Sequence, residues 1–101
     1  SIFVYLNEGE ALPCAPGGPA IKCYNVTQKM CEKSLAMSES ICKEWINKMA
    51  LPPGRLTGPI MQKCQESFLD SIFSGSRKGT PECHDFTQEL EGWRKRNQPP
   101  N

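Results

Sequence analysis

The stretch that decides the fold of this 101-residue chain runs from Gly58 to Gly75 and reads GPIMQKCQESFLDSIFSG. Pro59 suits the first turn of a helix, where its missing N–H loses no bond, and Gly75 suits the left-handed conformation that ends a helix. Between them, apolar residues recur at helical spacing and cover about half of the helix surface. These residues are Met61, Cys64, Phe68 and Ile72, with Ile60, Leu69 and Phe73 beside them. A helix of this kind must be covered on two sides, and we expect Cys64 to be bonded to the element that covers it.

Cysteines have to supplement the core of so small a protein. A single domain of this size buries only about two thirds of its unfolded surface. The six cysteines are an even number and include no C-x-x-C pair, which favours three disulfides over a zinc site or a redox motif. The six are Cys14, Cys23, Cys31, Cys42, Cys64 and Cys83. The sequence does not choose among the alternative pairings, but it predicts an oxidising, extracellular environment and no bound metal or cofactor.

The beginning of the chain supports secretion. Residues 2–6 form a short apolar run, and the small residues Gly9 and Ala11 follow it as a signal-peptidase site requires. Residues 1–11 are therefore interpreted as the remnant of a secretory signal peptide. The alternative is an N-terminal arm or edge strand that packs its apolar residues on the core. A membrane span is excluded for this run, because spanning a bilayer takes about 20 apolar residues.

One helical, disulfide-rich domain is expected over residues 12–97, followed by a loose tail at 98–101. Prolines and glycines between residues 12 and 20 predict a loop. The first helix is predicted to begin near Asn25, whose side chain can cap it together with Gln28. Asn25 also begins an N-glycosylation acceptor, Asn-Val-Thr, so a glycan there would compete with the cap. A second helix is predicted to follow the capping residue Ser38 and to end at Leu51, before two prolines.

The last helix, which follows Thr80, has the most complete set of start and end signals in the sequence. Thr80 is expected to cap it, Pro81 occupies its first turn, and residues 94–96 place three basic side chains at its negative end. Its packing seam steps by three or four residues through Cys83, Phe86, Leu90 and Trp93. The predicted fold is therefore all-α, a four-helix, disulfide-stapled small domain with proline-rich connecting loops.

Catalytic machinery is not predicted. The one histidine, His84, is followed by Asp85 on the last helix, and adjacent helical residues point to different sides. The aspartate therefore cannot orient the imidazole as a catalytic triad requires. We interpret His84 as a surface residue and predict no enzymatic activity.

The charge of the chain argues against nucleic acid as a partner. Twelve basic and eleven acidic residues give a net charge of +1. Two basic spots remain, Arg77-Lys78 and Arg94-Lys95-Arg96, and together they would form a weak site for heparin-like polyanions if the fold brought them side by side. The alternative is a solvated, flexible loop at residues 74–79 and a helix end that complements its own dipole.

The most informative exposed residue is Arg55. It follows Pro52-Pro53-Gly54 in a stiff connection, so a partner can bind it at a low cost in conformational entropy. An arginine presented in this way suits the acidic specificity pocket of a trypsin-like serine protease. Arg55 is the first candidate for a partner contact, followed by Arg77 and Lys78. The alternative is a turn between helices with a solvated arginine.

Two other functions remain open at this point. The four methionines, with tryptophan and phenylalanine, can line a cavity for a small apolar ligand or simply fill the core. The four are Met30, Met37, Met49 and Met61. A cysteine-rich receptor or ligand module is the second alternative, as in the helical domains of growth-factor receptors.

The size, the secretory N-terminal segment, the six cysteines and the helical pattern resemble small salivary proteins of blood-feeding insects, and within them the sand-fly complement inhibitors of the SALO type. The resemblance rests on these general features over the whole chain and on no motif, so it assigns no functional residue. It implies a secreted, extracellular protein of saliva that inhibits a host plasma protein in the classical complement pathway, such as a serine protease or another component.

Overall fold

The computed structural model describes residues 12–52 and 57–100. Its helices are α2 (Pro19–Cys23), α3 (Gln28–Asn47), α4 (Gly58–Ile72) and α5 (Pro81–Asn97), with the short 3₁₀ helix η1 (Ser74–Ser76) between the last two. The prediction of an all-α fold with four helices is confirmed. The predictions for residues 1–11 and for Arg55 lie outside the described residues.

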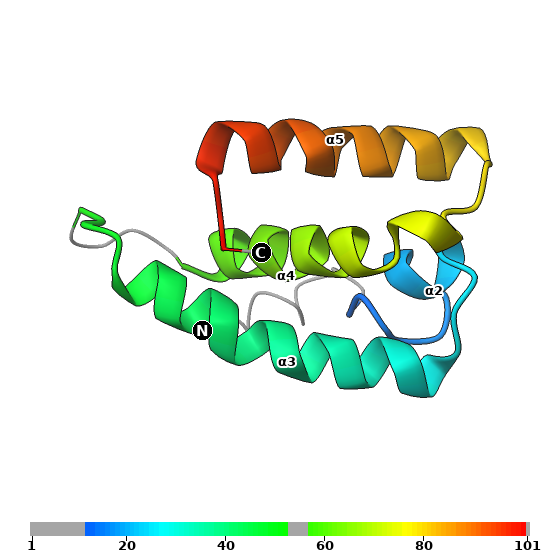
Figure 1. The fold of residues 1–101 in the computed structure, drawn as a ribbon, viewed down its shortest axis with the longest axis horizontal. Helices are drawn as coiled ribbons and strands as arrows, with labels where there is room; N and C mark the ends of the chain where they lie inside the picture. The colour runs from blue at the N-terminus through cyan, green and yellow to red at the C-terminus, as the bar shows by residue number, and fades with distance from the viewer. Residues whose placement is uncertain (1–11, 53–56, 101) are drawn as a thin grey trace.

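The central position belongs to α4. It lies between α3 on one side and α5 on the other, and α2 packs near its C-terminal end (Figure 1). The molecule measures 39 × 27 × 23 Å along its principal axes. Among the described residues, no helix combines the length and the apolar character needed to cross a membrane. The fold is thus built around α4, as its sequence predicts.

The burial of α4 extends beyond its apolar stripe. Met61, Cys64, Phe68 and Leu69 are buried as expected, whereas Ile72 is 44% exposed. Polar residues of the same helix are buried as well, namely Gln62, Gln65, Glu66, Ser67 and Asp70. The predicted end of this helix at Gly75 was also wrong. Helix α4 ends at Ile72, and η1 follows it. Gly75 lies within η1 and does not adopt the left-handed conformation.

One long helix, α3, replaces the two helices predicted before residue 51. Ser38 was expected to cap a new helix, but it is buried in the middle of α3 and donates a hydrogen bond to the Leu35 carbonyl oxygen (2.6 Å). The hydroxyl group of Thr27 caps α3 instead of Asn25 and accepts a hydrogen bond from the Met30 N–H. The number of helices is still four because of α2, which begins at the end of the loop predicted between residues 12 and 20.

Three disulfides connect the elements and use every cysteine. Cys42–Cys64 joins α3 to α4, which confirms that Cys64 is bonded to the helix that covers it. Cys23–Cys83 joins α2 to α5 across 60 positions in the sequence. Cys14–Cys31 fastens the loop before α2 to the first turns of α3. Each helix is therefore covalently attached to another one.

Around these bonds the core forms two clusters. One contains Tyr24, Leu69 and Phe73 with two of the disulfides, and the other contains Ile46 and Met61 with the third. Trp45 of α3 and Trp93 of α5 pack edge to face beside the second cluster, with ring centroids 5.8 Å apart. The side chains thus fill the space between the helices.

Helix α5 agrees with its predicted signals. Thr80 accepts a hydrogen bond from the Cys83 N–H, Pro81 is the first helical residue, and Leu90 is completely buried. Gln98 then adopts a left-handed conformation with φ of 49°. The chain after α5 turns back across α4 toward α3 (Figure 1), so that Pro100 lies against α3.

A single methyl group at Gly18 should disturb this fold. The added Cβ of Gly18→Ala would collide with the Leu12 carbonyl oxygen and lie 2.9 Å from that of Ala15, and both belong to the backbone of the loop fastened by Cys14. We expect this overpacking to cost about 1–3 kcal/mol of unfolding free energy. Gly79→Ala is the control, because its Cβ meets no atom within 4 Å. Urea denaturation measures both variants, and equal stabilities would contradict the predicted collision.

Candidate interaction surface

The connection between α4 and α5 carries Arg77 and Lys78, two of the three residues predicted to contact a partner. Its backbone is paired with the segment between α2 and α3. The N–H of Asn25 donates to the Ser76 carbonyl oxygen (2.8 Å), and the N–H of Lys78 donates to the Cys23 carbonyl oxygen (2.8 Å). A freely flexible basic loop was one prediction for this segment. The pairing instead fixes the backbone at both basic residues.

A covalent bond reinforces the same place. Cys23, which accepts the Lys78 hydrogen bond, is bonded to Cys83 in the first turn of α5, with 5.2 Å between the Cα atoms. Lys22 and Glu82 form an exposed ion pair beside it (2.9 Å). Such exposed pairs contribute little stability. The disulfide and the backbone hydrogen bonds therefore fix the position of the Lys78 backbone, from which the side chain extends.

Behind this segment lies a buried carboxylate, Asp70 of α4. Its Oδ1 accepts hydrogen bonds from the Tyr24 hydroxyl group (2.6 Å) and from Nε of Arg77 (3.0 Å). Its Oδ2 accepts hydrogen bonds from Nη2 of Arg77 and from Nη2 of Arg94 on α5 (3.1 Å). The Asp70 side chain has no exposed surface. Burial of a charge is tolerated only when the charge is paired and hydrogen-bonded, and these three residues supply both.

The two arginines extend this network in opposite directions. Nη1 of Arg94 donates to the Ser67 carbonyl oxygen (2.9 Å) and to the Ser71 hydroxyl group (2.7 Å), both on α4. Nη1 of Arg77 pairs with Glu91 of α5 (2.9 Å). A network centred on one carboxylate thus connects α4, α5, the segment between them and the residue that follows α2. We call these five residues the Asp70 network: Tyr24, Asp70, Arg77, Glu91 and Arg94.

The network changes the acid–base properties of its members. Burial alone would raise the pKa of Asp70, but the hydrogen bonds from Arg77, Tyr24 and Arg94 outweigh burial and keep that pKa below its ordinary value of 3.8. Burial, together with the hydrogen bond to Asp70, raises the pKa of the Tyr24 phenol far above its ordinary value of 10.0. Both groups therefore keep their charge state across the physiological pH range.

A groove opens between the fixed segment and the first turns of α5. Its volume is about 520 Å³. Eight residues line it, namely Arg77, Lys78, Gly79, Pro81, His84, Asp85, Thr87 and Gln88. Lys78 is exposed and has no ion-pair partner among the described residues. The groove therefore offers a preformed polar surface with one unpaired cation at a fixed position.

The two basic spots of the sequence meet only in part in the fold. Arg77 and Arg94 bind the same carboxylate of Asp70, which neutralises part of their charge. The other two basic residues of the helix end, Lys95 and Arg96, lie about 20 Å further along α5 than its first turn, because a helix rises about 1.5 Å per residue. Weak binding of polyanions remains a prediction, and the geometry favours Lys78 as a contact for a single carboxylate over a continuous basic patch.

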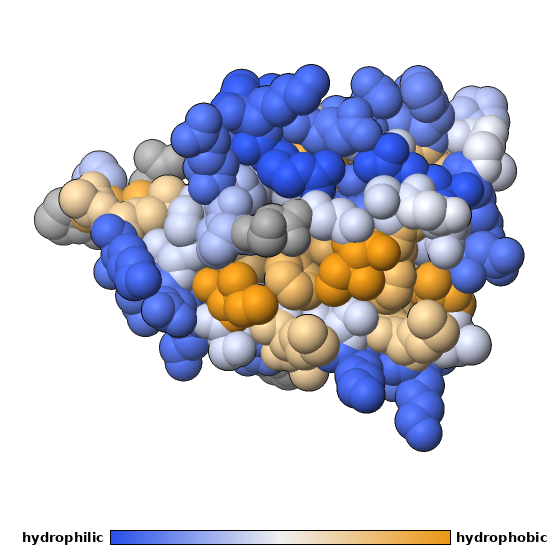
Figure 2. Space-filling view, viewed as in Figure 1, coloured by the Kyte–Doolittle hydropathy of each residue, from blue (hydrophilic) through white to orange (hydrophobic). Residues whose placement is uncertain are grey.

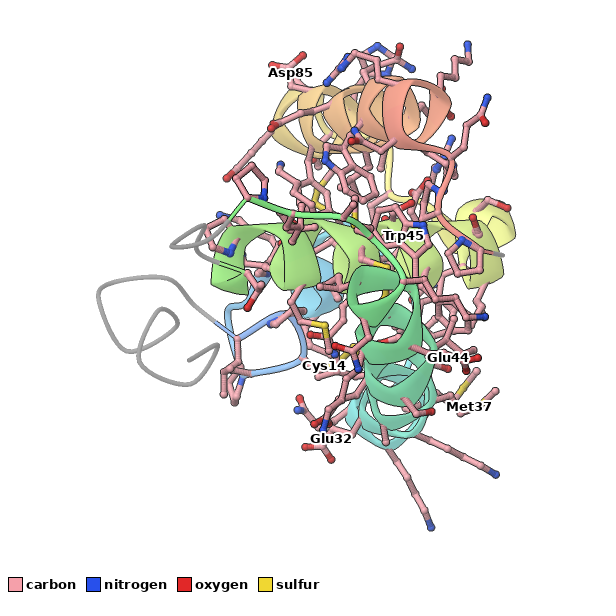
Figure 3. The ribbon with its side chains drawn as sticks, turned by 90° about the vertical axis from the view of Figure 1, so that its left-hand side faces the viewer. Cys14, Glu32, Met37, Glu44, Trp45 and Asp85 are labelled. Carbon is pink, nitrogen blue, oxygen red and sulfur yellow. A yellow bond between two sulfur atoms is a disulfide. The ribbon has the colours of Figure 1, made fainter. Side chains whose placement is uncertain are left out.

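Two further predicted residues can be placed. The side chain of Asn25 is exposed, so the glycosylation acceptor is accessible. Thr27 of the same acceptor caps α3, so a glycan on Asn25 does not compete with a cap as first expected. His84 is exposed at the groove, and Asp85 points outward from α5 (Figure 3).

No protein-family model matches the chain, and no significantly similar protein was found among curated sequences or among solved structures. The functional interpretation therefore depends on the residues and the geometry of the chain itself.

The Asp70 network was not among the features predicted from the sequence. Local sequence gives no signal for it, because Asp70 is nine residues from Met61 and therefore lies on the side of α4 opposite the predicted apolar stripe, where a carboxylate is ordinarily solvated. Once buried, a carboxylate requires a cationic partner. Which of the twelve basic residues supplies it depends on the packing of α5 on α4, and that packing cannot be read from local sequence.

The Asp70 network predicts a loss of stability at high pH. The pKa of Tyr24 is higher in the folded protein than in the unfolded chain. The contribution of Tyr24 to the free energy of unfolding is therefore fully present below pH 10 and is lost as the pH rises further. Between pH 8 and pH 11 the loss should reach about 1.4 kcal/mol, because the unfolded phenol releases its proton and the folded one does not.

Denaturation by urea at pH 8 and pH 11 measures this loss. Tyr24→Phe is the matched control, because it keeps the ring and removes the ionisable group. We expect the stability of this variant to depend less steeply on pH than that of the wild type. Identical pH dependence in the two proteins would show that the Tyr24 hydroxyl group is not held by Asp70.

Proposed function

We propose that the protein is secreted and acts without catalysis, by binding a host plasma protein and inhibiting it. The first target to test is the classical complement pathway, in accordance with the resemblance to salivary complement inhibitors. The observation that carries the proposal is the set of three disulfides that attaches every helix to another. Stable disulfides are typical of secreted proteins and rare in reducing compartments.

The rigidity of the scaffold supports a binding function. The Lys78 N–H donates a hydrogen bond to the carbonyl oxygen of Cys23, the last residue of α2, and the Cys23–Cys83 bond fastens that residue to α5. A partner that binds here does not have to order a flexible loop, which lowers the entropic cost of association. Inhibition by simple occupation of a partner's surface requires only such a rigid, exposed contact.

Arg55 remains the first candidate for a contact with a serine protease, on the basis of its proline-rich sequence context. It follows α3 in the connection to α4, whereas Lys78 precedes α5. The two residues therefore belong to different connections, and each can be tested without changing the other.

The exposure of two methionines supports protein binding over transport of a small apolar ligand. Met30 and Met37 are 51% and 52% exposed, so two of the four methionines lie on the surface and do not line an internal cavity. The other two belong to the second core cluster, where Met61 is buried and Met49 is partly buried.

Lysis assays of the classical, lectin and alternative complement pathways test the proposal. The wild-type protein should inhibit classical-pathway lysis, and Arg55→Ala should weaken inhibition about tenfold, which corresponds to about 1.4 kcal/mol of binding energy. We expect a smaller loss from Lys78→Ala. Lys43→Ala is the control, because Lys43 is an exposed lysine within α3, away from both connections.

Complete lysis in all three pathways at every concentration of the wild-type protein would contradict inhibition of complement. A pull-down from plasma with the folded protein, followed by mass spectrometry, then shows whether any plasma protein is bound. Capture of no protein would contradict the wider proposal as well.

A further inference from the structure

The face of the molecule turned toward the viewer in Figure 2 carries a band of apolar side chains over α3 and α4. Three residues of these two helices are large, apolar and about half exposed, namely Met30 (51%), Met37 (52%) and Ile72 (44%). Ile41 of α3 is partly exposed. We call these four residues the apolar strip. Single exposed apolar residues are ordinary, whereas a continuous row of them marks an interaction surface.

Helix geometry places the strip along one line. Met30, Met37 and Ile41 are separated by seven and four residues, so they lie on one side of α3. That side is about 100° away from the side of Cys31, Ser38 and Cys42, which is buried against the rest of the molecule.

On α4, Ile72 is seven residues beyond Gln65, and a separation of seven residues again places both on one side of the helix. Gln65 contacts Ser38 of α3 through a hydrogen bond of 3.3 Å. Ile72 therefore lies on the side of α4 that faces α3, and the strip spans both helices.

A hollow of about 220 Å³ lies at the C-terminal end of the strip. Ile41 and Trp45 of α3 form its apolar wall together with Pro100, and the Glu44–Lys48 ion pair borders it. Trp45 is held in place from behind by the edge-to-face contact with Trp93. Figure 3 shows Met37, Glu44 and Trp45 on the same side of the molecule, with Cys14 on the other side of α3. The strip thus ends in a fixed pocket of a size for one large apolar side chain.

The dimensions and the chemistry of the strip fit a helix. Met30 and Trp45 are 15 residues apart, which corresponds to about 22 Å along α3, or about four turns of a second helix laid beside it. Methionine side chains adapt to irregular apolar surfaces, and amphipathic helices bind such grooves through apolar residues three, four and seven positions apart.

The charges beside the strip indicate the character of that helix. Lys29 and Lys33 lie on the edge of α3 that is turned away from its buried side. Both are exposed, and neither has an ion-pair partner among residues 12–52 and 57–100. At the far end, Lys48 is already paired with Glu44 (3.2 Å). A bound helix with carboxylates along one edge would therefore meet two unpaired cations.

A second copy of the chain fits this surface less well. A stable dimer needs about 800 Å² of each partner, and a strip one helix wide offers less.

We propose that the apolar strip and its hollow are a second interaction surface, which binds an acidic amphipathic helix of a partner protein. One large apolar side chain of that helix fills the hollow beside Trp45, and its carboxylates face Lys29 and Lys33. This surface is separate from the groove at Lys78, so each can be disabled while the other is retained.

Two synthetic helical peptides of about 18 residues serve as probes. Both carry leucine at positions 1, 5, 8, 12 and 15, and their flanking positions are glutamate in one and lysine in the other. Binding to the full-length, disulfide-bonded protein is measured by fluorescence polarisation. We expect the glutamate peptide to bind at least tenfold more tightly than the lysine peptide.

Three exposed positions on α3 give matched variants. Met37→Glu should abolish binding of the glutamate peptide. Lys33→Glu should weaken binding of the glutamate peptide by about fivefold and strengthen binding of the lysine peptide, whereas Lys43→Glu, outside the strip, should change neither. Circular dichroism confirms that each variant keeps its helices, which separates loss of the surface from loss of the fold.

Several results would overturn the proposal. Equal affinities for the two peptides, or no binding of either at millimolar concentration, would do so. Sedimentation of a wild-type dimer that Met37→Glu dissociates would assign the strip to a second copy. Binding to phosphatidylserine vesicles that is lost in Met37→Glu, without binding to the glutamate peptide, would assign it to a membrane surface. Complement assays of Met37→Glu are independent of these outcomes, because the groove is intact in that variant.

Discussion

Covalent attachment of every helix to another is the constraint on which the rest of this structure depends. A helix of five residues such as α2 is not stable alone, because nucleation of a helix is unfavourable and short helices gain too few bonds to offset it. The Cys23–Cys83 bond spans 60 positions, and restriction of the unfolded chain by a loop of this length contributes about 4 kcal/mol. This contribution is comparable with the whole stability of many small domains. The Cys23–Cys83 bond therefore allows α2, the residues that follow α2 and the first turn of α5 to form one rigid region.

The second determinant is the burial of α4 on two opposite sides. Because α3 and α5 pack on opposite sides of it, even residues on its polar side lose water, and Asp70 becomes a buried charge that requires compensation. Arg77 and Arg94 reach it from two different elements and thereby fix the approach of α5 to α4. The same contacts occupy Arg77, so the neighbouring Lys78 is the basic residue of that segment left for a partner. Structural pairing within the fold thus decides which side chain is available for function.

Local sequence signals predicted those features that depend on local physics. The cap at Thr80, the proline in the first turn of α5 and the central, disulfide-bonded helix follow from residues near each other in the chain. The division of α3 into two helices was wrong, because Ser38 resembles a cap, yet tertiary packing buries it within a continuous helix. The disulfide pairing, the partners of Asp70 and the groove at Lys78 depend on how distant helices pack, and the sequence left them open. The apolar strip was partly visible as methionines at helical spacing, although these were interpreted as core or cavity residues.

The pairing of the cysteines is the most direct test of this account. Proteolysis of the native, unreduced protein followed by mass spectrometry of the linked peptides identifies the pairs. The account predicts the bonds Cys14–Cys31, Cys23–Cys83 and Cys42–Cys64 and no free thiol. A different set of linked peptides, or cysteines that react with a thiol reagent in the native protein, would contradict the arrangement of the helices and the extracellular role inferred from it.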